Sequence, residues 1–134
     1  MDLNNVINTY KVILSNASTT SKNDKRRNGV DKIIGLFIKN PETKSEGLNF
    51  LESLDTETFY NLLSAWDIGR SVLTAPDCLN DDIRINGGKT NLMKENVKTL
   101  KNNLPIQYEA AIYFKDKDCI FVKQCLIAFQ KEFI

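Results

Sequence analysis

The chain has 134 residues, of which 42% are hydrophobic and 26% charged, and this composition indicates one folded globular domain over 1–134 rather than a disordered chain. The 18 Lys and Arg nearly balance the 17 Asp and Glu, which excludes an overall electrostatic field that recruits nucleic acid or an anionic membrane. The chain contains no histidine, so any site lacks the commonest general base and metal ligand.

The N-terminal segment has the apolar spacing of an amphipathic helix that Asp2 caps. Its apolar stripe consists of Leu3, Val6, Ile7, Tyr10, Ile13 and Leu14. From 15 to 28 the only apolar side chain is Ala17, so this stretch has nothing to bury against a core. We therefore predict a mobile polar loop over about 15–28.

Two short helices are predicted after this loop. The apolar positions of the first are Val30, Ile33, Ile34, Phe37 and Ile38. Pro41 ends it, because the residue before a proline avoids the helical conformation. The second lies between Thr43 and Ser53 and buries Leu48 and Leu51, although Gly47 weakens it by about 1 kcal/mol relative to alanine.

The clearest helix begins at Asp55, whose side chain is suited to the N-cap position, with Glu57 in the first turn. Pro76 ends the helix. The apolar stripe consists of Phe59, Leu62, Leu63, Trp66 and Leu73. Arg70 projects from the middle of this stripe, so its guanidinium must stack on an aromatic ring, pair with an acid such as Asp67, or reach a partner.

The segment from 77 to 88 is rich in turn residues, and Ile83 and Ile85 alternate there as a short strand would. Thr90 or Asn91 then caps a further helix. Its apolar side carries Met93, Val97, Leu100 and Leu104. The flank of that side carries Lys94, Lys98 and Lys101.

The segment 106–122 is compatible with two helices or with a β-hairpin around the charged residues 115–118. We favour helices, because the 3.6-residue period continues to the end of the chain. That period is carried by Val122, Cys125, Leu126, Phe129 and Phe133. A second apolar line on the opposite side, formed by Ile120, Ile127 and Ile134, indicates that this last helix is either central or half of an interface.

Three groups of residues resemble chemical motifs, but each lacks a residue or a spacing that the motif requires. The sequence Gly87-Gly88-Lys89-Thr90 resembles the end of a phosphate-binding loop, but Ile83 stands where that loop needs a glycine. The acidic group Asp77, Asp81 and Asp82 lacks the spacing of a calcium loop. The three cysteines, Cys78, Cys119 and Cys125, lack the spacing of a metal site. We expect no metal, no cofactor and no catalytic residue.

The expected fold is therefore an all-α, compact bundle of about six or seven short helices, with at most one small β-hairpin. The expected function is that of a cytoplasmic, non-catalytic protein-binding module of the inhibitor, immunity or adaptor type, which occludes a surface of its partner. That partner is another protein chain or a second copy, and no membrane is involved. The predicted partner-binding residues are Trp66, Arg70, Ile120, Ile127 and Ile134.

The alternative is a nucleic-acid-associated regulator that uses two lysine-rich elements. Its contact residues would be Lys22, Lys25, Arg26, Arg27, Lys94, Lys98 and Lys101. It requires the fold to bring both elements to one side. The nearly neutral net charge and the absence of a nucleic-acid-binding motif disfavour it.

Overall fold

The computed structural model describes residues 2–25 and 46–134, and all regular secondary structure in these two ranges is α-helical. The helices are α1 (Leu3–Lys25), α3 (Thr56–Thr74), α4 (Pro76–Asn86), α5 (Lys89–Asn103), α6 (Gln107–Lys115) and α7 (Cys119–Phe133), and residues 46–53 are also helical. No strand occurs in the described ranges, so 106–122 forms parts of α6 and α7 and not a hairpin. The prediction of an all-α bundle of short helices is confirmed.

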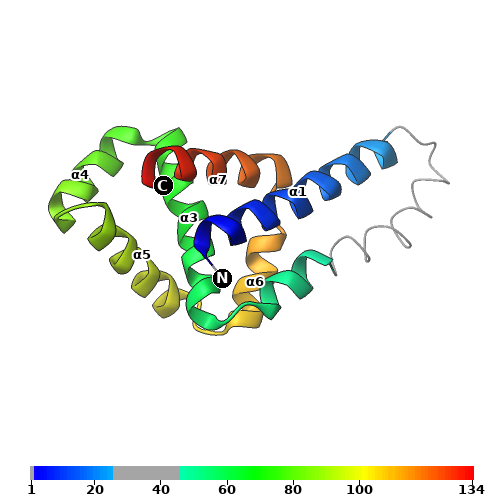
Figure 1. The fold of residues 1–134 in the computed structure, drawn as a ribbon, viewed down its shortest axis with the longest axis horizontal. Helices are drawn as coiled ribbons and strands as arrows, with labels where there is room; N and C mark the ends of the chain where they lie inside the picture. The colour runs from blue at the N-terminus through cyan, green and yellow to red at the C-terminus, as the bar shows by residue number, and fades with distance from the viewer. Residues whose placement is uncertain (1, 26–45) are drawn as a thin grey trace.

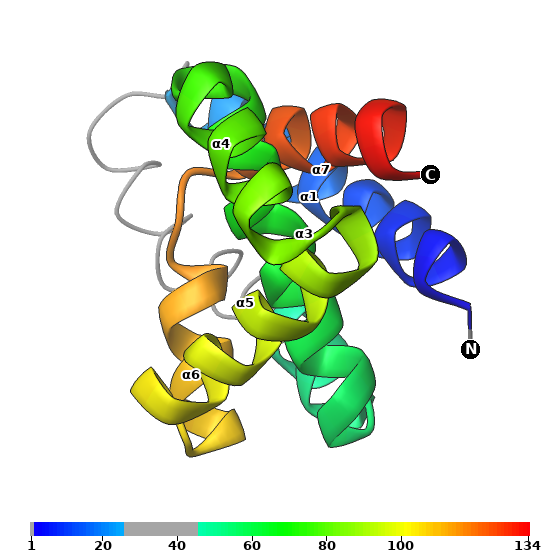
Figure 2. The same cartoon turned by 90° about the vertical axis from the view of Figure 1, so that its left-hand side faces the viewer.

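Helix α3 lies in the middle of the bundle and packs against α1, α4, α5, α6 and α7. Figure 1 shows the arrangement along the long axis, and Figure 2 shows α5 on one side of α3 and α1 with α7 on the other. Because α3 has neighbours on several sides, even Ser64 and Ala65 between its apolar positions are buried. The core of the bundle is therefore built around one helix rather than between two layers.

The ends of α3 lie where the sequence predicts them. The Asp55 carboxylate accepts a hydrogen bond from the backbone N–H of Thr58 at 3.3 Å, which satisfies one of the free donors of the first turn. At the other end the Ala75 N–H donates to the carbonyl of Ser71, directly before Pro76. Local sequence thus determines both boundaries of the central helix.

Helices α3 and α7 cross with almost no space between their backbones. A Cβ atom placed on Gly69 of α3 would lie 1.9 Å from the carbonyl oxygen of Cys125 on α7. Only a residue without a Cβ permits this approach, which brings the buried Ala65 and Ile68 of α3 into the core beside α7. The sequence carries no signal for this role, because an isolated glycine in a helix is otherwise only a weak point.

The prediction of a loop over 15–28 is wrong for residues 15–25, because α1 continues as a helix to Lys25. The Ser15 hydroxyl donates to the carbonyl of Lys11 at 2.9 Å within the helix. Extending an existing helix costs far less free energy than starting one, so α1 continues beyond its apolar stripe. Residues 26–28 and the predicted helix at 30–38 lie outside the described residues.

Helix α4 replaces the turns and the short strand that we predict between 77 and 88. Pro76 opens the helix, and Leu79 and Ile83 lie one turn apart and pack against the core, whereas Ile85 is 75% exposed. Gly87 ends it with a φ of 82°. Helix α5 follows with Gly88 at its N-cap, so the predicted cap at Thr90 or Asn91 is also wrong.

Candidate functional site

An open groove lies between α3 and α7. It encloses about 340 Å³, and we call it the α3/α7 groove. Its lining consists of Val72, Leu73, Gln124, Ile127, Ala128, Lys131 and Glu132. Leu73 is 48% exposed beside it, although the sequence places this leucine on the stripe that α3 buries. The groove therefore combines an apolar lining with an exposed apolar edge.

Of the three isoleucines predicted as partner-binding residues, Ile120 and Ile127 lie on α7 and Ile134 is its C-cap, and Ile127 lines the groove. They are seven residues apart, which is close to two helical turns, so they share one side of the helix. Ile120 is 46% exposed and Ile134 is 63% exposed, while Ile127 is half-buried in the groove lining. Leu73, which we did not predict as a site residue, lines the groove together with Ile127.

Trp66 lies in the core and not on the surface. It is only 3% exposed, and its ring packs against Phe114 at 5.4 Å and against Tyr113 at 6.3 Å between centroids. Its indole N–H has no hydrogen-bond partner in the part of the chain that the structure describes. This position indicates that Trp66 packs in the core, where a partner cannot contact its ring unless the neighbouring side chains move.

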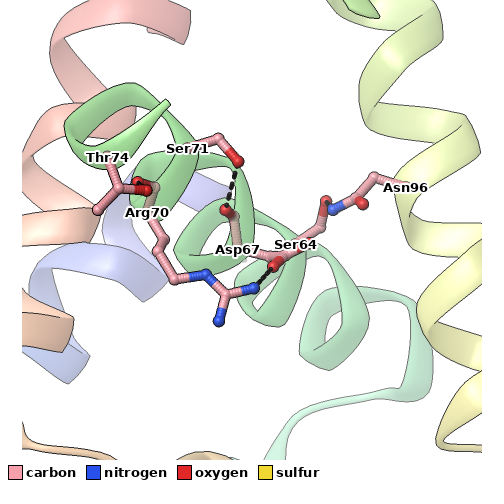
Figure 3. A network of polar contacts seen from close by, with 6 residues as sticks. All are labelled: Ser64, Asp67, Arg70, Ser71, Thr74 and Asn96. Carbon is pink, nitrogen blue, oxygen red and sulfur yellow. Dashed lines mark hydrogen bonds and ion pairs between the residues drawn. The ribbon is translucent and has the colours of Figure 1, made fainter. Parts of the chain in front are cut away.

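The positive charge of Arg70 has partners within the chain. Its guanidinium lies 4.7 Å from the centroid of the Trp66 ring. It also forms an ion pair with Asp67 one turn earlier, which Figure 3 shows. Thr74 continues the network by donating to the Arg70 carbonyl at 2.8 Å. The Arg70 side chain remains 45% exposed, so it can still touch a partner without being an unpaired buried charge.

A buried polar contact joins the opposite side of α3 to α5. The Asn96 side-chain amide donates to the Ser64 hydroxyl at 2.8 Å, and that hydroxyl lies 3.4 Å from the Met93 sulfur. Figure 3 shows Ser64 and Asn96 facing each other between the two helices. Because a buried hydroxyl is costly without a partner, this contact favours one alignment of α3 with α5.

The turn between α4 and α5, which resembles part of a phosphate loop, is tied to the end of α7. The Lys89 ammonium donates to the Glu132 carbonyl at 2.6 Å and lies 5.2 Å from the centroid of the Phe133 ring. Gly87 and Gly88 both have positive φ, which the turn requires. Lys89 thus connects two helices in this structure.

The described parts of the two lysine-rich elements belong to helices at different ends of the molecule. Lys94 and Lys98 lie exposed on α5, whereas 22–25 belongs to the far end of α1, at the opposite end of the long axis in Figure 1. Arg26 and Arg27 lie outside the described residues.

Two of the described cysteines, Cys119 and Cys125, lie in surroundings that raise the pKa of their thiols. Burial raises the pKa of the Cys125 thiol, and burial with the neighbouring Asp118 raises that of Cys119, so both favour the unreactive protonated form. In the described ranges, no three His, Cys, Asp or Glu side chains stand close enough to hold a metal ion. Asp81 on α4 pairs with Arg84 at 3.0 Å.

Within 2–25 and 46–134 no helix combines the length and the apolar character needed to cross a membrane. Comparison of the chain with protein-family models, with curated proteins and with solved structures gives no match.

Proposed function

We propose that the protein is a non-catalytic protein-binding module that occludes a surface of its partner through the α3/α7 groove and the isoleucines beside it. One observation carries the proposal: Leu73 is exposed in a groove with a mainly apolar lining, and Ile120 and Ile134 are exposed on the same side of α7 as Ile127, which lines that groove. Contiguous exposed apolar surface of this kind is typical of interaction sites. Inhibitor, immunity and adaptor proteins all act by covering a partner in this way.

The shape of the surface favours an amphipathic helix of the partner as the bound element. The groove runs along more than two turns of α7 and is closed on one side by the last turn of α3, and the apolar line on α7 repeats every two turns. A helix with apolar residues at positions i, i+4 and i+7 presents a matching stripe. Covering the exposed halves of Leu73, Ile120 and Ile134 would contribute on the order of 1 kcal/mol each to the free energy of binding.

The experiment compares Leu73→Glu, Ile120→Glu and Ile134→Glu with the control Ile85→Glu, which changes an even more exposed isoleucine on α4. Native mass spectrometry of the chain isolated from its own cells measures complex formation, and calorimetry measures stability. We expect the three site variants to lose the complex, while every thermal midpoint stays within about 2 °C of the unmodified protein.

Two results would contradict the proposal. One is an unmodified chain recovered as a monomer with no stoichiometric companion. The other is a complex that survives all three site variants, since the partner would then bind elsewhere. A complex containing only copies of this chain identifies the partner as a second copy, which the proposal includes.

A further inference from the structure

A second groove lies between α3 and α5, and it shares no residue with the α3/α7 groove. It encloses about 350 Å³, and we call it the α3/α5 groove. Its lining consists of Glu57 and Asn61 from α3 and of Met93, Lys94, Val97, Lys98, Lys101 and Asn102 from α5. This combination of lysines, amides and apolar side chains differs from the mainly apolar α3/α7 groove.

The charges in this groove are unevenly balanced. Lys101 forms an ion pair with Glu57 and lies 5.9 Å from the centroid of the Tyr60 ring, so both charges are matched within the chain. Lys94 and Lys98 are exposed and form no ion pair or hydrogen bond with the described residues. Two positive charges therefore remain unmatched, in a chain whose net charge is only +1.

The spacing of the lysines matches a polypeptide. Lys94, Lys98 and Lys101 occupy positions i, i+4 and i+7 of α5, so they follow one side of the helix over roughly 10 Å. Met93 and Val97 lie beside them in the same groove, and a methionine side chain adapts readily to different apolar partners. Carboxylates one turn apart can pair with Lys94 and Lys98 while an apolar residue between them covers Met93.

The same groove is poorly suited to nucleic acid. No aromatic side chain lines it, so bases have no ring on which to stack. Two unmatched lysines also neutralise fewer phosphates than nucleic-acid-binding proteins usually do.

We infer that the α3/α5 groove binds an acidic, amphipathic segment of another protein. The two grooves share no residue, so the test of this inference and the test of the proposed function can give different results.

The test uses fluorescence anisotropy with a labelled peptide of roughly twelve residues that carries glutamates at i, i+4 and i+7 with leucines between them. We compare Lys98→Glu with Arg84→Glu, which changes the net charge equally at an exposed position of α4 that lines neither groove. We expect Lys98→Glu to weaken binding by roughly fivefold to tenfold, and Arg84→Glu to change it by less than about twofold. A peptide with glutamines in place of glutamates should bind at least about fivefold more weakly than the acidic one.

Three outcomes would overturn the inference. The acidic peptide could fail to bind the unmodified protein at millimolar concentration. Arg84→Glu could weaken binding as much as Lys98→Glu, which would show only a general effect of charge. A single-stranded DNA oligomer of similar length could bind more tightly than the peptide and lose that affinity in Lys98→Glu, which would assign the groove to nucleic acid.

Discussion

Replacing Gly69 by alanine is the most direct perturbation of the contact between α3 and α7. The new Cβ atom would lie 1.9 Å from the Cys125 carbonyl oxygen, whereas ordinary van der Waals contact begins at 3.4 Å. The neighbouring atom belongs to the backbone of a helix, so it cannot rotate aside as a flexible side chain can. The two helices must separate by about 1.5 Å, and the core residues around the crossing lose their close packing.

The magnitude follows from two opposing contributions. Overpacking a core costs up to about 3 kcal/mol, and the upper end applies because the obstacle is a rigid carbonyl. Alanine in a helix interior is about 1 kcal/mol more favourable than glycine, which offsets part of that cost. The free energy of unfolding of Gly69→Ala should therefore fall by about 2 kcal/mol, which lowers the thermal midpoint of a chain of this size by roughly 8 °C.

The matched control is Gly47→Ala, which makes the same chemical change at another buried glycine in a helix. Its Cβ atom would meet only Ile13 Cγ2 at 3.8 Å, an ordinary contact, so the propensity gain should dominate and raise stability by about 0.5 kcal/mol or more. Urea denaturation and calorimetry of the two variants give the comparison. The reasoning is refuted if Gly69→Ala is as stable as the unmodified protein, or if both variants shift in the same direction.

Three further predictions concern buried polar groups. Burial raises the pKa of Tyr10 above its usual 10.0, so the folded state keeps a proton that the unfolded chain releases and stability falls as the pH rises above 10. Tyr10→Phe should lose less stability between about pH 8 and about pH 11 in urea titrations, and an unchanged slope would argue against this origin. Tyr60→Phe removes the hydrogen bond from the phenol to the Leu104 carbonyl and should lower the free energy of unfolding by about 1 kcal/mol. An unchanged free energy of unfolding would mean that water replaces the phenol as the donor. Asn96→Ala leaves the buried Ser64 hydroxyl without its amide donor and should also lower the free energy of unfolding by about 1 kcal/mol. A variant as stable as the unmodified protein would contradict this prediction.

The proposed binding sites differ in how far the sequence anticipates them. Helical spacing alone shows that Ile120, Ile127 and Ile134 share one side of α7, and it identifies Lys94 and Lys98 as neighbours. It does not show that Leu73 stands beside the isoleucines, because that proximity depends on how α3 crosses α7. Nor does it reveal that Trp66 is buried under its neighbours.

The local sequence by itself determined the all-α class and the boundaries of α3, because capping at Asp55 and the break at Pro76 act within one turn of the chain. The sequence also showed that Arg70 needs a partner, but the folded structure decided that Asp67 and the Trp66 ring meet this need. For α4, local residues were ambiguous, and packing of Leu79 and Ile83 against the core decided in favour of a helix. Periodicity reports which residues share a face, whereas the crossing of distant helices decides which faces are covered and which remain free to bind.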